Sequence, residues 1–146
     1  MPGANVGRIV SSTPKGRIFT DEPWLSVQWD RSHNCIYAEW KGFANSNEFR
    51  TSTMRILDAI EDRKVPALVS DNRRLEGVST ADQLWLRDDW VPKAVAVGLL
   101  RIAVVLPGRG LGKISSEEII SRFGKTDFAT RTFTSVSEAT EWASEA

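Results

Sequence analysis

The chain has 146 residues, a length that one domain with a single hydrophobic core commonly has. Its 19 basic and 19 acidic side chains give a formal net charge of zero, so it lacks the basic excess of a general phosphate-backbone binder, and nucleic acid is not an expected partner. A single cysteine cannot form a disulfide within the chain, and no apolar run reaches the length of a membrane span or a signal-peptide core. These features favour a cytoplasmic protein.

Residues 1–16 differ in composition from the rest of the chain. They are rich in Gly, Ser and Pro and contain few apolar residues. Such a segment buries too little apolar surface to offset the entropy that ordering costs. The sequence therefore predicts a flexible N-terminal tail over residues 1–16 and a single domain over residues 17–146.

The domain is predicted to open with an antiparallel meander. Apolar and polar residues alternate after Arg17, which places one side of each segment in the core. Residues 30–34 are rich in turn formers and short enough to close a hairpin. The three predicted strands span residues 18–20, 24–30 and 35–42.

After Gly42 the spacing of the apolar residues lengthens to that of a helix. Asn45 and Glu48 have the spacing of a capping box, in which each side chain accepts a hydrogen bond from a free backbone N–H of the first turn. Pro66 disfavours helical geometry in the residue before it. The first helix should therefore begin at Asn45 and end near Lys64.

A short apolar run over residues 67–70 is typical of a buried parallel strand. The helix that follows it should begin at a cap supplied by Ser79 or Thr80. Pro92 lies inside this helix and has no N–H to donate, so we expect a kink or break near residues 90–91.

The rest of the chain repeats the strand–helix unit. Residues 101–106 form the clearest central strand. Ser115 is predicted to cap a third helix that ends near Gly124, a strand follows over residues 130–134, and Ser135 caps a terminal helix. This order implies parallel strands joined by right-handed crossovers. The predicted fold is α/β (α+β), with N-terminal antiparallel strands leading into β-α repeats, one mixed sheet and about four helices.

Several short motifs follow one another along residues 17–146. They are Trp-Lys-Gly-Phe at 40–43, Asp-Asn-Arg-Arg at 71–74, Trp85 with Trp-Val-Pro at 90–92, and Gly-Leu-Leu-Arg-Ile-Ala-Val-Val at 98–105. With the order of elements, these motifs resemble the STAS domain (sulfate transporter and anti-sigma factor antagonist), and more closely the small bacterial SpoIIAA-like proteins of the STAS/SEC14 type. The resemblance implies a SpoIIAA-like fold and a regulatory role exerted by binding rather than by catalysis.

One feature of that family is absent from the expected place. Anti-sigma factor antagonists of this fold carry a phosphorylatable serine in an Asp-x-Ser-Gly-type loop before the second helix, but no serine lies two places after Asp71. Ser79 is the remaining candidate phosphosite. A serine at this point is equally explained by its use as a helix cap.

Residues 71–74 form the first candidate site for a ligand or partner. They are Asp71, Asn72, Arg73 and Arg74, and they follow a parallel strand at the edge where open α/β sheets bind ligands. Two guanidinium groups beside a carboxylate could hold an anion through paired N–H donors. The alternative is that an Asp–Arg pair simply orders the loop.

A second candidate site for an anion lies in the glycine-rich stretch 108–116. Free N–H groups at a helix start can bind an anion, and Lys113, Ser115 and Ser116 are the residues that would hold it there. The spacing does not match a phosphate-binding P-loop, because three rather than four residues separate Gly108 from Gly112. A turn that ends in a serine cap is the alternative.

The chain contains six tryptophans, most of which core packing would explain. Trp85 and Trp90 are candidates for a different role, because a break at Pro92 could open an aromatic cleft between the second helix and the meander. His33 and Cys35 are the single histidine and cysteine, too few for a zinc site or for an oriented catalytic pair. We therefore predict no catalytic residue, metal or cofactor.

Three functions remain open at this point. The leading hypothesis is a non-enzymatic binding or regulatory module that forms a homodimer through an exposed sheet or helix face and binds a protein partner or small ligand. The second is a carrier or sensor of a small apolar or lipid-like ligand in the aromatic cleft. The third is an enzyme acting on an anionic substrate at Arg73 and Arg74.

Overall fold

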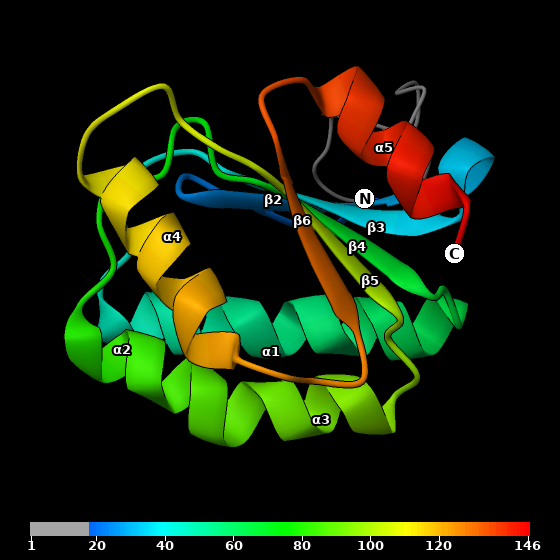
Figure 1. Cartoon of the computed structure of the whole chain (residues 1–146), viewed down its shortest axis with the longest axis horizontal. Helices are drawn as coiled ribbons and strands as arrows, with labels where there is room; N and C mark the ends of the chain where they lie inside the picture. Colours follow the sequence, from blue (N-terminus) through cyan, green and yellow to red (C-terminus); the bar gives the residue numbers. More distant parts are fainter. Residues whose placement is uncertain (1–17) are drawn as a thin grey trace.

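Six strands lie side by side in their sequence order in the computed structural model, which describes residues 18–146 (Figure 1). The first three strands are antiparallel, and β3 to β6 are parallel. The predicted mixed sheet is confirmed, while the predicted tail lies outside the described residues. The strands are β1 Ile18–Glu22, β2 Leu25–Asp30, β3 Cys35–Trp40, β4 Ala67–Asp71, β5 Arg101–Val105 and β6 Ala129–Phe133.

Helices cover both faces of the sheet. Three of them lie against one face and α5 lies against the other (Figure 1). The second of the three is continuous from Thr80 to Ala96, so the expectation of four main helices is confirmed. In the described part of the chain, no helix is both long and apolar enough to cross a bilayer. The helices are α1 Ser46–Arg63, α2 Thr80–Trp85, the π-helical segment η3 Leu86–Trp90, α3 Val91–Ala96, α4 Leu111–Phe123, α5 Val136–Ser144 and the single turn η2 Arg31–His33.

Helix α1 begins and ends through local interactions. The Asn45 side chain accepts a hydrogen bond from the Glu48 N–H at 2.8 Å, and the Glu48 carboxylate accepts one from the Asn45 N–H at 2.9 Å. Lys64 ends the helix in the left-handed conformation with φ of 52°. The predicted capping box and the predicted C-terminal end are both confirmed.

The second helix accommodates Pro92 without a break. Its start is confirmed, because the Ser79 hydroxyl accepts a hydrogen bond from the Asp82 N–H at 3.2 Å. Before Pro92 the helix widens into the π-helical segment, in which the Val91 N–H donates to the Leu86 carbonyl. Because a π turn adds one residue, the chain absorbs the hydrogen bond that proline cannot make and remains helical.

Helix α4 corrects one prediction from the sequence. It begins at Leu111, with Gly110 before it at φ of 92°, and not at Ser115. Ser115 lies in the second turn, where its hydroxyl accepts a hydrogen bond from the Val78 N–H at 2.9 Å. A Cβ at Gly112 would lie 1.9 Å from the Leu75 carbonyl oxygen, so glycine allows this first turn to pack directly against the loop that follows β4.

The core has two parts, one on each face of the sheet. The larger part lies beneath α1, the π-helical segment and α4, and includes Trp40, Phe49 and Trp90. The smaller part lies beneath α5 and is built mainly from alanine and valine. Small side chains such as Ala103 and Ala139, both fully buried, let α5 lie close to the sheet.

Candidate functional site

The loops after β3, β4 and β5 meet at the carboxyl ends of the parallel strands. A Cβ placed on Gly42 would lie 3.7 Å from the Glu76 carboxylate, and one placed on Gly77 would lie 3.5 Å from the Leu111 Cβ. The loop after β4 is therefore packed between the loop after β3 and the start of α4. This is the edge at which open α/β sheets bind ligands and partners.

This edge exposes an unusual set of side chains, which we call the carboxyl-edge surface. Three large apolar side chains, Phe43, Leu111 and Ile114, are 64%, 71% and 52% exposed. The side chains of Arg73 and Arg74 are 50% and 64% exposed at the same edge. Exposed large apolar side chains mark surfaces that bind other proteins, and arginine is enriched at such interfaces.

Asp71 lies at the centre of a buried hydrogen-bond cluster on the α5 side of the sheet. Its carboxylate is 1% exposed and accepts bonds from the Arg73 Nε at 2.9 Å and the Arg73 Nη2 at 2.8 Å. The Tyr37 hydroxyl also donates to it. The Asp–Arg pair foreseen as the structural alternative is therefore present, and it holds Arg73 against the end of β4.

At neutral pH the Asp71 carboxyl group in this cluster is ionised and the Tyr37 hydroxyl is protonated. Burial raises the pKa of Asp71, but the hydrogen bonds from Arg73 and Tyr37 outweigh that effect and hold the pKa below its usual value. Burial, reinforced by the bond to the Asp71 carboxylate, raises the pKa of Tyr37 well above its usual range. Asp71 is thus a fixed anion and Tyr37 a fixed neutral donor, which suits them to structure rather than to proton transfer.

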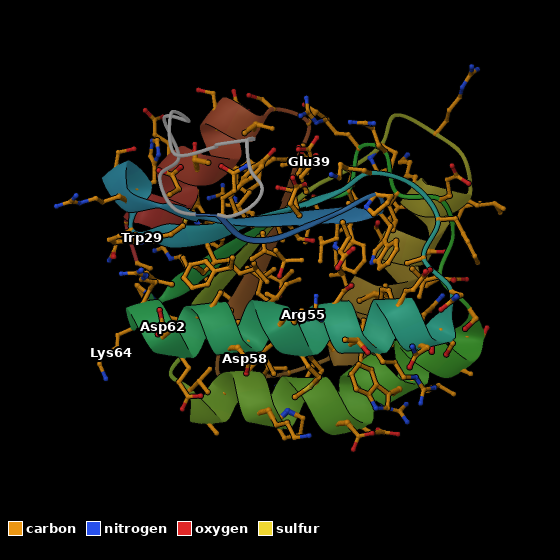
Figure 2. The ribbon with its side chains drawn as sticks, turned by 180° about the vertical axis from the view of Figure 1, so that it is seen from behind. Trp29, Glu39, Arg55, Asp58, Asp62 and Lys64 are labelled. Atoms are coloured by element: carbon orange, nitrogen blue, oxygen red, sulfur yellow. The ribbon has the colours of Figure 1, made fainter. Side chains whose placement is uncertain are left out.

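The other two residues of the predicted 71–74 site, Asn72 and Arg74, contact residues other than Asp71. Arg74 approaches the Glu39 carboxylate at 3.5 Å, and Figure 2 shows Glu39 on the side of the sheet away from α1. The Asn72 side chain lies on the opposite face, where its Nδ2 donates to the Ser116 hydroxyl at 2.9 Å. The structure brings Asp71 and Arg73 together, and it separates Asn72 from them. Anion binding by the two arginines stays a prediction.

The residues predicted to bind an anion near α4 do not form a common group. Ser115 and Ser116 are buried, and their hydroxyls bond to Val78 and to the Gly112 carbonyl. Lys113 lies half-buried in the first turn. The sequence placed the helix start one turn too late, so Ser115, which was predicted to cap the helix, and Ser116 both lie inside the helix and are buried.

Ser79, the candidate phosphosite, is exposed and caps α2. Its neighbour Asp82 is buried and accepts bonds from the Ser46 hydroxyl at 2.6 Å and the Arg50 Nε at 2.8 Å. Burial raises the pKa of Asp82, but the hydrogen bonds from Ser46, Arg50 and Ser79 outweigh that effect and hold the pKa below its usual value. The Asp82 carboxylate is therefore ionised at neutral pH. The cap role of Ser79 is confirmed, and its phosphorylation stays a prediction.

Of the two tryptophans assigned to a cleft, Trp90 lines a cavity and Trp85 does not. Trp85 is half-buried, and the guanidinium carbon of Arg50 lies 5.3 Å from the centre of the Trp85 ring. Trp90 is buried, and its indole N–H donates to the Thr53 carbonyl at 2.8 Å. The cavity beneath the π-helical segment has a volume of about 70 Å³. Its lining is mostly apolar and comes from the sheet, α1 and α4, including Phe49, Ile56, Leu68, Ile102, Ile119 and Phe123.

Sequence reasoning missed three residues at the carboxyl ends of the strands. Tyr37 was not singled out, although the alternation of β3 places it on the same face as Glu39. Leu111 and Ile114 were passed over because the start of α4 was placed after them. Their spacing of three residues would have signalled one helix face.

No protein-family model matches the chain, and no curated protein matches it. Among residues 18–146, no group of three or more His, Cys, Asp or Glu side chains is arranged to hold a metal ion. The function must therefore be argued from the geometry described above.

Proposed function

We propose that this chain is a non-enzymatic binding module of the STAS type, which engages a protein partner through the carboxyl-edge surface. The observation that carries the proposal is the exposure of Phe43, Leu111 and Ile114 on the loop after β3 and the start of α4, at the end of the sheet where Arg73 and Arg74 are also exposed on the loop after β4. Loops held by a rigid scaffold commonly carry binding residues. Apolar and arginine side chains supply most of the energy at protein interfaces.

The polar groups near this surface support binding over catalysis. The Asp71 carboxylate is committed to Arg73 and Tyr37, and Asn72 is committed to Ser116 and Ser70. A catalytic group must instead present an uncommitted donor or acceptor to the substrate. The Nε and Nη2 groups of Arg73 already donate to Asp71, so fewer of its donors remain for an anionic substrate. This weakens the case for an enzyme with its substrate site at Arg73 and Arg74.

A carrier of a lipid-like ligand is the second candidate, and the cavity that Trp90 lines is the observation in its favour. Pockets that hold drug-sized ligands are typically about 300–1,000 Å³. The cavity beneath the π-helical segment, at about 70 Å³, is several times smaller. Since a lipid would need a large expansion of this site, we place protein binding first.

The proposal can be tested by affinity capture from the native cell with surface variants. The double variant Phe43→Ala with Leu111→Ser removes the apolar part of the carboxyl-edge surface. Leu100→Ser is the matched control. Leu100 is 52% exposed, but it directly precedes β5 and so lies at the amino ends of the parallel strands, away from the carboxyl-edge surface. Proteins captured by the wild type should be identified by mass spectrometry and then titrated as purified partners.

We expect the double variant to bind the purified partner at least about tenfold more weakly than the wild type, and the control to bind equally well. Equal binding by all three proteins would show that the partner docks elsewhere. Turnover of a metabolite by the purified chain, lost on changing one polar residue, would contradict the non-enzymatic assignment.

A further inference from the structure

Strand β6 forms one edge of the sheet, and its outer side carries unpaired backbone groups. Among residues 18–146, β6 pairs with β5 alone, as the outermost strand between α4 and α5 in Figure 1. The Ala129 N–H donates to the Leu100 carbonyl and the Phe133 carbonyl accepts from the Leu106 N–H, each at 2.9 Å. Because successive residues of a strand direct their backbone groups to opposite sides, those of Thr130 and Thr132 point away from β5.

The β6 edge has neither a proline, a lysine nor a β-bulge, three of the features that prevent edge strands from pairing. Its sequence is Ala-Thr-Arg-Thr-Phe, with no proline and no lysine, and its five residues pair with β5 without any shift of register. The opposite edge strand, β1, has an irregular register between Ile18 and Thr20 and ends in two acidic residues. Helix α5 packs mainly on β4 and β5 and less on β6. An unprotected edge of this kind is a template for another strand.

We propose that a second copy of this chain pairs with β6 in antiparallel fashion, about a two-fold axis that passes through Thr132, so that one sheet runs through both copies. The proposal is independent of the carboxyl-edge surface. A two-fold pair is closed, because the same edge is used by both copies and the bulged β1 edges remain at the two ends. The formal net charge of zero means that no long-range repulsion opposes the approach of two copies.

The charges and side chains of β6 select the register. A two-fold axis at Arg131 would place the two Arg131 side chains directly opposite each other, and like charges in that position are destabilising. An axis at Thr130 would place Thr132 opposite Phe128, which is buried and precedes the strand. An axis at Thr132 pairs threonine with threonine and places Arg131 opposite Phe133 of the second copy.

The register with its axis at Thr132 extends the cation–π contacts that Arg131 already makes within each copy. The Arg131 guanidinium lies 5.9 Å from the ring centre of Phe133 and 5.9 Å from that of Trp142 on the α5 face. In the pair, Phe133 of the second copy would lie on the same face, where its ring can add a third cation–π contact to Arg131. The paired edge is short, so we expect a weak dimer with Kd on the order of 10–100 μM.

Disulfide trapping tests the register directly. In the proposed pair the two Thr132 Cα atoms lie about 5.5 Å apart, within the range of about 4.4–6.8 Å that a disulfide spans. The two Thr130 residues would be offset by four residues along the strands, about 13 Å. Thr132→Cys should therefore form a cross-linked dimer under mild oxidation, and Thr130→Cys is the matched control. The native Cys35 is fully buried and does not compete.

We expect at least about ten times more cross-linked dimer from Thr132→Cys than from Thr130→Cys. Equal cross-linking of the two variants would overturn the register. Sedimentation of the unmodified chain supplies a second readout: it should show a dimer at about 1 mM that Thr132→Pro weakens at least tenfold, with circular dichroism to check that the variant is folded. A wild-type chain that stays monomeric at that concentration, or a dimer that Thr132→Pro leaves unchanged, would refute the proposal.

Discussion

Replacing Tyr37 by phenylalanine removes one hydroxyl from the buried cluster around Asp71 and leaves the ring in place. The lost bond is made to an ionised carboxylate that is 1% exposed, and bonds to charged groups contribute about 1.5–3 kcal/mol. Arg73 keeps its two bonds to the same carboxylate, so the charge is not left unpaired. We therefore expect Tyr37→Phe to lower the free energy of unfolding by about 2 kcal/mol and the Tm by roughly 6–8 °C.

The size of this effect should depend on pH in a defined direction. Arg73 and Tyr37 hold the pKa of Asp71 below its usual value despite burial, so the stabilisation from the carboxylate is present above the unfolded pKa of about 3.9. It is lost as the pH falls through the lower folded pKa. The difference between wild type and Tyr37→Phe should stay constant from neutral pH to about pH 5 and shrink below pH 4, where the bond becomes one between neutral groups.

Urea denaturation at pH 7 and pH 3 measures both quantities. Thr140→Val is the matched control, because the Thr140 hydroxyl is buried but donates to the Val136 carbonyl at 3.1 Å, an acceptor that does not titrate. Its effect should be the same at both pH values. A loss below about 0.5 kcal/mol for Tyr37→Phe at pH 7, or a loss that does not shrink at pH 3, would refute the assignment of Asp71 as a buried anion held by Tyr37.

Three further predictions concern the packing and the helix capping that position the site. Gly112→Ala should cost about 2 kcal/mol or more in urea unfolding, because its Cβ would lie 1.9 Å from the Leu75 carbonyl, whereas Gly108→Ala meets nothing within 4 Å and should be nearly neutral. Asn45→Ala removes the capping box and should cost about 1 kcal/mol, measured as a fall in Tm. Val104 lines the cavity of about 70 Å³, so Val104→Ile should change stability by less than about 0.5 kcal/mol, while Val105→Ile, at a fully buried position under α5, should cost about 1–3 kcal/mol. Equal effects of the two valine substitutions would contradict the placement of the cavity.

The two proposed surfaces lie on different parts of the molecule and can be tested separately. The carboxyl-edge surface is formed by loops and by the first turn of α4, whereas the pairing edge is the backbone of β6. A dimer through β6 would carry two carboxyl-edge surfaces. A partner with two matching sites would then bind with increased avidity.

Features governed by neighbouring residues could be predicted from the sequence. The Asn45 capping box, the left-handed end of α1 at Lys64 and the Ser135 cap of α5 depend on groups within a few residues of one another. The alternation in β2 and β3 revealed which side chains face the core, because strand geometry repeats every two residues. From these signals the order of elements, and so the mixed sheet, could be derived before any contact was known.

Features governed by residues far apart in the sequence could not be predicted from the sequence. Ser115 has the sequence signature of a helix cap, but Gly112 lets an earlier turn pack beneath Leu75, and that long-range contact decides where α4 begins. The carboxylate of Asp71 acquires its partner Tyr37 from a strand 34 positions earlier. Propensities and caps are local, so the sequence by itself determined the elements and their order. The buried cluster, the exposed loop edge and the free side of β6 exist only after the strands assemble, because they depend on which distant residues share a face of one sheet.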